Sequence, residues 1–173
     1  MFIGIIAGVS VPLVMSFVLG LSAGYMLYFT TESITSFIYL LLVGSLLTFI
    51  FLTIAILLAL RSDEKIKIFG LGIFYWLSLA ILYDGLIMML AINFSDYPIE
   101  LPALILSALN PIDLGRILIT MNSDIAALMG YTGAMYQQYF GSLTGKVLAF
   151  TLLLCWGVIP LFFAKRKFEK NDF

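Results

Sequence analysis

The stretch ITSFIYLLLVGSLLTFIFLTIAILLAL (Ile34–Leu60) decides the fold class, because it contains no charged residue. An α-helix needs about 20 consecutive apolar residues to cross the hydrocarbon core of a bilayer, and this stretch is longer than that. In lipid the backbone must satisfy its own hydrogen bonds, which a helix does within one segment. The stretch therefore predicts a transmembrane helix.

Three more runs have the same character, at residues 2–29, 68–92 and 147–164, and only the run 68–92 contains a charge, Asp84. Of the 173 residues 62% are hydrophobic and 11% are charged, whereas soluble domains carry about 25% charged residues. The sequence predicts an all-α integral membrane protein. It has one transmembrane domain over residues 1–173, with four transmembrane helices.

Basic residues predict the orientation in the membrane. Arg61, Lys65 and Lys67 lie between the second and third runs, and four more basic residues follow the last run within residues 165–170. Cytoplasmic loops carry an excess of lysine and arginine. Both termini are therefore expected in the cytoplasm, and the long connection before the last run is expected outside.

That external region, about residues 98–141, is too apolar for a free loop and too interrupted for a span. Short helices that re-enter the bundle or lie in the interface are expected. Asn110 suits an N-cap, Pro111 the first helical position and Asp113 the first turn, while Arg116 lies one turn further on and can pair with Asp113. Aspartate in place of Asn110 is expected to preserve this cap. We therefore interpret these polar residues first as structural, at a bend where a short helix begins.

A second helix start is predicted at NSDI, with Ser123 or Asp124 as its cap. Asp84 is the costliest residue in the chain, because a charge deep in the bilayer costs a few kcal/mol. It must face protein or water, be protonated, or hydrogen-bond a neighbour such as Tyr83. Two interpretations stay open: a polar pathway or switch, or a satisfied hydrogen bond between helices.

No enzymatic site is visible. The chain has no histidine, one cysteine and a net charge of −1, which argues against haem or metal ligation, a disulfide within the chain and nucleic-acid binding. The GLSAG motif (Gly20–Gly24) has no histidine base and lies in a span, so it indicates helix packing. Asp84 lacks a second intramembrane aspartate for a protease dyad. We expect no enzyme and no cofactor bound by this chain.

Three motifs carry a family resemblance: LSALNPIDLGRILI (Leu106–Ile119), ALMGYTGAMYQQYFG (Ala127–Gly141), and a last span ending in FFAKRKFEKNDF (Phe162–Phe173). The segment from Ala59 to Leu90, with aspartate after an aromatic residue at Tyr83, is also similar. Together they resemble the C-terminal part of ABC-2 type permeases, and more narrowly the NosY-type permease of the nitrous oxide reductase maturation system.

The resemblance implies a membrane subunit of an ABC transporter in the bacterial inner membrane. Such permeases have six spans, pair with a second copy and dock cytoplasmic ATPase subunits that bind ATP. The NosY type also meets a periplasmic maturation protein and exports a sulfur species, or passes on ATP-driven motion, for assembly of the reductase's copper–sulfur cluster. Asp84 and Tyr83 become candidates for a pathway or switch. The candidate external contacts are Asn110, Pro111, Asp113, Arg116, Tyr131 and Tyr136.

The chain departs from that family in its length. Its four runs look like spans three to six, so the first two spans and the coupling segment after them are expected to be missing or supplied separately. The alternative from a different class is a non-transporting membrane anchor or scaffold that holds a periplasmic assembly factor.

Overall fold

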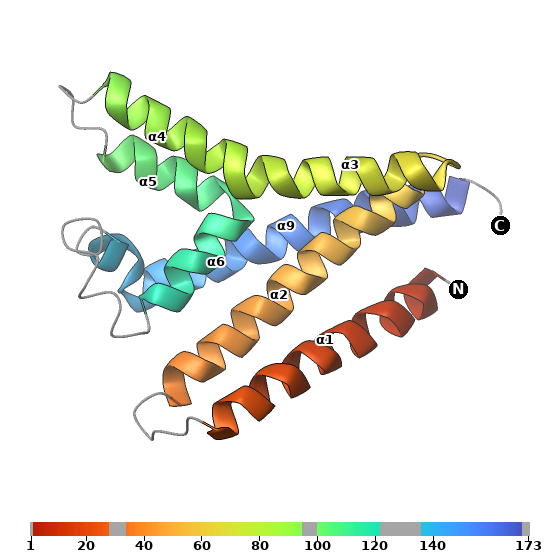
Figure 1. Ribbon diagram of the computed structural model, residues 1–173, viewed down its shortest axis with the longest axis horizontal. Helices are drawn as coiled ribbons and strands as arrows, with labels where there is room; N and C mark the ends of the chain where they lie inside the picture. The colour runs from red at the N-terminus through yellow and green to blue at the C-terminus, as the bar shows by residue number, and fades with distance from the viewer. Residues whose placement is uncertain (1, 28–33, 95–99, 122–135, 171–173) are drawn as a thin grey trace. The chain divides into compact units, whose positions relative to one another are not determined.

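The computed structural model describes residues 2–27, 34–94, 100–121 and 136–170, and these residues form helices joined by short turns, without a strand. Four of the helical stretches are long and apolar enough to cross a membrane, so the protein is an all-α membrane protein, as the sequence predicts. The four are α1 (Phe2–Leu27), α2 (Ile34–Ala59), the continuous stretch Lys65–Asn93, and α9 (Leu143–Lys170) (Figure 1).

The third of these helices contains an irregular turn. It consists of α3 (Lys65–Leu77), a π-helical segment η2 (Ser78–Leu82) and α4 (Tyr83–Asn93). The backbone N–H of Tyr83 donates to the carbonyl of Ser78, five residues earlier. Such a turn widens the helix and shifts the direction of the side chains that follow it, and π-turns are frequent at functional sites.

Two short helices precede the last span and meet at a sharp bend. They are α5 (Glu100–Leu109) and α6 (Pro111–Thr120), and the bend between them is 110°. At 1.5 Å per residue, each ten-residue helix covers about half of a 30 Å hydrocarbon core. The pair therefore has the geometry of a re-entrant segment or a broken span, which agrees with the short helices predicted for residues 98–141.

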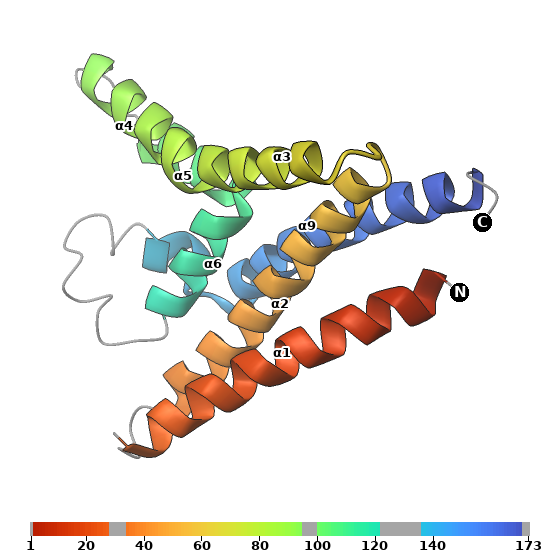
Figure 2. The same cartoon turned by 45° about the vertical axis from the view of Figure 1, so that its right-hand side comes forward.

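The described residues group into two compact units, although the sequence suggests one transmembrane domain over residues 1–173. The first unit comprises residues 1–68 and 154–173. In it α1 and α2 run antiparallel and side by side (Figures 1 and 2), and the ring of Phe17 lies against Gly44, where a Cβ would collide with it. Ile50 of α2 is fully buried and packs beside Gly157 of α9.

The second unit comprises residues 69–153 and has its core on α6. Leu114, Ile117 and Leu118 of this helix are buried, and α6 packs against η2 while α5 packs against α4. Six of the ten residues of α6 are buried, so its backbone is covered by protein. This cover is what a non-spanning helix requires at membrane depth.

Candidate functional site

Asn110 stands at the bend between α5 and α6 and is fully buried. Its backbone is extended, with φ −96° and ψ 122°, and its side-chain Oδ1 accepts a hydrogen bond from the backbone N–H of Ile112 at 3.1 Å. Pro111 follows in the first turn of α6, where its missing N–H costs nothing. The helix cap predicted from the sequence is thus confirmed.

The amide nitrogen of Asn110 donates two hydrogen bonds that are not part of the helix cap. Nδ2 donates to the carbonyl of Leu79 in η2 at 2.8 Å and to Oδ2 of Asp113 at 3.1 Å. Aspartate at position 110 could still accept the N–H of Ile112 and cap α6, as expected from the sequence, but the cap is only one of the contacts at this position. A carboxylate there would lose both donated bonds and face a carbonyl oxygen and a second carboxylate.

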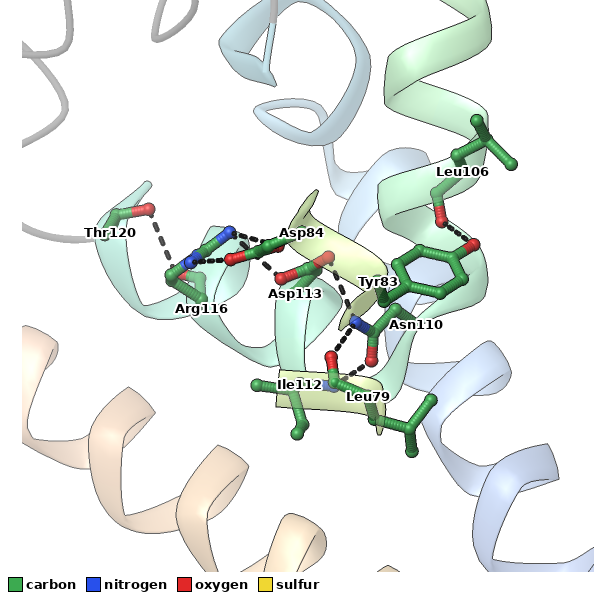
Figure 3. Close-up of polar contacts among 9 residues, drawn as sticks. All are labelled: Leu79, Tyr83, Asp84, Leu106, Asn110, Ile112, Asp113, Arg116 and Thr120. Atoms are coloured by element: carbon green, nitrogen blue, oxygen red, sulfur yellow. Dashed lines mark hydrogen bonds and ion pairs between the residues drawn. The ribbon is translucent and has the colours of Figure 1, made fainter. Parts of the chain in front are cut away.

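Arg116 lies between two carboxylates (Figure 3). Its Nη2 is 2.9 Å from Oδ1 of Asp113, which confirms the predicted pair one turn apart. Its Nη1 is 3.1 Å from Oδ2 of Asp84, on another helix and 32 residues away, and Nη2 approaches the other oxygen of Asp84 at 3.4 Å. Arg116 thus joins the third long helix to α6 through a two-point contact.

Sequence reasoning missed the pairing of Asp84 with Arg116. A signal for it exists, because Asp84 is the only charge in the run 68–92 and Arg116 is the only basic residue within 98–141. Two isolated opposite charges in apolar surroundings are favoured to meet, since each offsets the desolvation of the other.

Tyr83 does not satisfy Asp84, contrary to the neighbour bond considered from the sequence. Its hydroxyl donates to the carbonyl of Leu106 in α5 at 2.8 Å. Successive residues of a helix point about 100° apart, so Tyr83 and Asp84 reach different partners. Tyr83 ties α4 to α5, while Asp84 ties α4 to α6.

The members of this cluster differ in exposure. The Asp113 side chain is 2% exposed, whereas those of Asp84 and Arg116 are 39% and 58% exposed. With both carboxylates ionised, the cluster carries two negative charges and one positive charge. Arg116 is anchored on its inner side by buried Asp113, and it meets Asp84 at the accessible side. The contact with Asp84 can therefore open while Arg116 keeps a carboxylate partner.

Among the residues that the structure describes, no group of three or more histidine, cysteine, aspartate or glutamate side chains could hold a metal ion. The cluster offers charge and directed hydrogen bonds, and its geometry suits a joint between helices. Tyr136 lies in a helical segment at residues 136–140 and is half-buried. Tyr131, Ser123 and Asp124 lie outside the described residues.

Comparisons with protein-family models, with curated protein sequences and with solved structures find no match to this chain. The resemblance to ABC-2 type permeases therefore rests on the motifs of the sequence.

Proposed function

We propose that the chain is a membrane permease subunit of an ABC-2 type transporter that serves maturation of the copper site of nitrous oxide reductase. The observation that carries this proposal is the bent pair α5–α6 before the last long helix, joined by Arg116 to Asp84. Because α6 is largely buried and is joined to that span by the ion pair of Arg116 with Asp84, it is suited to following the movement of the span. One of the motifs that resemble the NosY-type permeases, Leu106–Ile119, lies on α5 and α6.

In this proposal ATP is hydrolysed by a separate cytoplasmic subunit, and the chain works beside a second permease copy in the bacterial inner membrane, with both termini cytoplasmic. Movement of the third span pulls on Arg116 through Asp84, while Asp113 keeps Arg116 in place on α6. The external region around residues 98–141 then exports a sulfur species or passes the motion to a periplasmic maturation protein.

Isolation of the tagged chain from the membranes of its native host tests the proposal. We expect an ABC ATPase subunit in stoichiometric amount and ATP hydrolysis that vanadate inhibits. Cells that lack the chain are expected to make nitrous oxide reductase without its copper–sulfur cluster, which its visible absorption spectrum reports. A folded chain that retains a periplasmic assembly factor but no ATPase would instead indicate the anchor or scaffold.

Asp84→Asn tests the joint within this function. The amide keeps the shape of the side chain but loses the ionic contact with Arg116, so the complex should assemble in normal yield while ATP-dependent maturation falls. Asp63→Asn is the matched control, because Asp63 is exposed in the loop after α2 and makes no ion pair with a described residue. Full maturation activity in the Asp84 variant would reduce Asp84 to a structural residue.

A further inference from the structure

Besides the cluster around Arg116, the protein has a second group of charged residues, which belongs to the unit of residues 1–68 and 154–173. They line a pocket of about 310 Å³ at the ends of α2 and α9, a volume at the lower end of the range for ligand pockets. We call it the basic pocket, and its lining residues are Leu57, Arg61, Phe163, Arg166, Lys167 and Lys170.

The basic pocket lies where two apolar helices become charged. Helix α2 ends at Ala59, and Arg61 follows two residues later. Helix α9 continues for six mostly charged residues past Ala164, to Lys170. Leu57 and Phe163 come from the apolar side of this boundary. The pocket therefore combines an apolar wall with a basic rim, at the end of two helices that are long and apolar enough to span a membrane.

The positive charge of the pocket has no partner among the described side chains. Arg61, Arg166, Lys167 and Lys170 form no ion pair with a described carboxylate. Glu169 pairs with Lys165 at 3.9 Å, and Lys165 does not line the pocket. Among the described residues, the other acidic residues close in sequence, Asp63 and Glu64, follow Arg61 but do not line the pocket either. Four cations thus surround one concave site.

We propose that the basic pocket binds the phosphate headgroup of an anionic phospholipid, with an acyl chain against Leu57 and Phe163. Guanidinium groups bind phosphate oxygens in a bidentate manner, and lysines add point charges. Basic pockets between transmembrane helices suit acidic lipid headgroups. An apolar wall directly beside the cations favours a lipid over an acidic protein segment, because an anionic phospholipid carries its phosphate and its acyl chains at the short, fixed separation that this lining offers. This inference does not depend on the proposed transport function.

The test is native mass spectrometry of the full chain in detergent, titrated with phosphatidylglycerol or with zwitterionic phosphatidylcholine. The pocket variant is Lys167→Gln/Lys170→Gln. The matched control is Lys65→Gln/Lys67→Gln, which also removes two lysine charges but leaves the lining intact. We expect the pocket variant to lose phosphatidylglycerol affinity on the order of tenfold more than the control, as for the loss of charge-assisted hydrogen bonds. Phosphatidylcholine binding should be alike in both.

Two results would overturn the proposal. Equal losses in the pocket and control variants would mean that net charge alone attracts the lipid. Displacement of phosphatidylglycerol by millimolar inorganic phosphate, with no preference for the lipid, would make the pocket a site for free anions. A circular dichroism spectrum and a thermal midpoint like those of the unmodified chain ensure that each variant is folded.

Discussion

At the scale of single residues, Asn110 fixes the bend between α5 and α6. One oxygen caps α6 through the N–H of Ile112, and one nitrogen serves both Leu79 and Asp113. A buried amide with three of its hydrogen-bonding positions occupied is costly to replace, because any smaller side chain leaves these groups unpaired. Asn110 therefore specifies the angle between α5 and α6 as well as the start of α6.

Replacement of Asn110 should show both roles. Asn110→Ala is expected to lower the free energy of unfolding by about 2–3 kcal/mol, because the loss of the cap costs about 1 kcal/mol and the groups left unpaired add to it. Asn110→Asp should be no better than alanine, although aspartate is a good cap elsewhere. Thermal unfolding in detergent measures both changes.

Asn93→Ala is the control for this series, since Asn93 is exposed and its side chain donates, among the described residues, to the carbonyl of Met89 within its own helix. It should change stability by no more than about 0.5 kcal/mol. An aspartate variant at position 110 as stable as the unmodified protein would mean that the bonds to Leu79 and Asp113 contribute little.

At the scale of elements, the helices and the contacts between sequence neighbours could be predicted, whereas the contacts between distant segments could not. The uncharged runs predict the long helices because length and polarity alone decide membrane insertion. The NPID cap and the pair of Asp113 with Arg116 depend on neighbours in sequence, so pattern reasoning finds them. The hydrogen bond from Asn110 to Leu79 in η2 and the contact of Asp84 with Arg116 join segments 31 or 32 residues apart. For the second contact the sequence offers one signal, the lone opposite charges Asp84 and Arg116, and it becomes visible only when the two segments are considered together.

The start of α9 shows how closely two elements can approach. Ser142 accepts a hydrogen bond from the N–H of Gly145 at 3.0 Å and so caps the helix. A Cβ at Gly145 would lie 2.8 Å from Cα of Phe140 and would also meet the carbonyl oxygen of Tyr139. Glycine permits this approach because it carries no side chain.

Gly145→Ala should therefore destabilise the protein by about 1–3 kcal/mol, as overpacking does elsewhere. Gly72→Ala in α3 is the matched control, because nothing lies within 4 Å of the position that the added methyl group would occupy and alanine favours a helix by up to about 1 kcal/mol. Thermal midpoints in the same detergent compare the two. An unchanged thermal midpoint for Gly145→Ala would show that the turn before α9 can widen without loss of stability.

At the scale of the whole molecule, the basic residues predict the orientation in the membrane. Seven of the nine lysine and arginine residues lie in the loop after α2, in the first turn of α3 or at the end of α9. Single cysteines at Asp63 and Gln138, introduced after Cys155→Ala, test this orientation in intact cells. An impermeant maleimide should label the cysteine at position 138 and spare the one at position 63 until the membrane is opened. Labelling only at position 63 would invert the orientation.

Arg116 connects α6 to the third long helix through its ion pair with Asp84. A double-mutant cycle with Asp84→Asn, Arg116→Gln and the combined variant tests it most directly, with the free energy of unfolding measured by steric trapping in bicelles. Arg116→Gln should cost more than Asp84→Asn, because it also leaves the buried Asp113 carboxylate without its cation. We expect a coupling energy of about 1 kcal/mol, within the range of polar contacts between membrane helices. Additive effects within about 0.3 kcal/mol would contradict it.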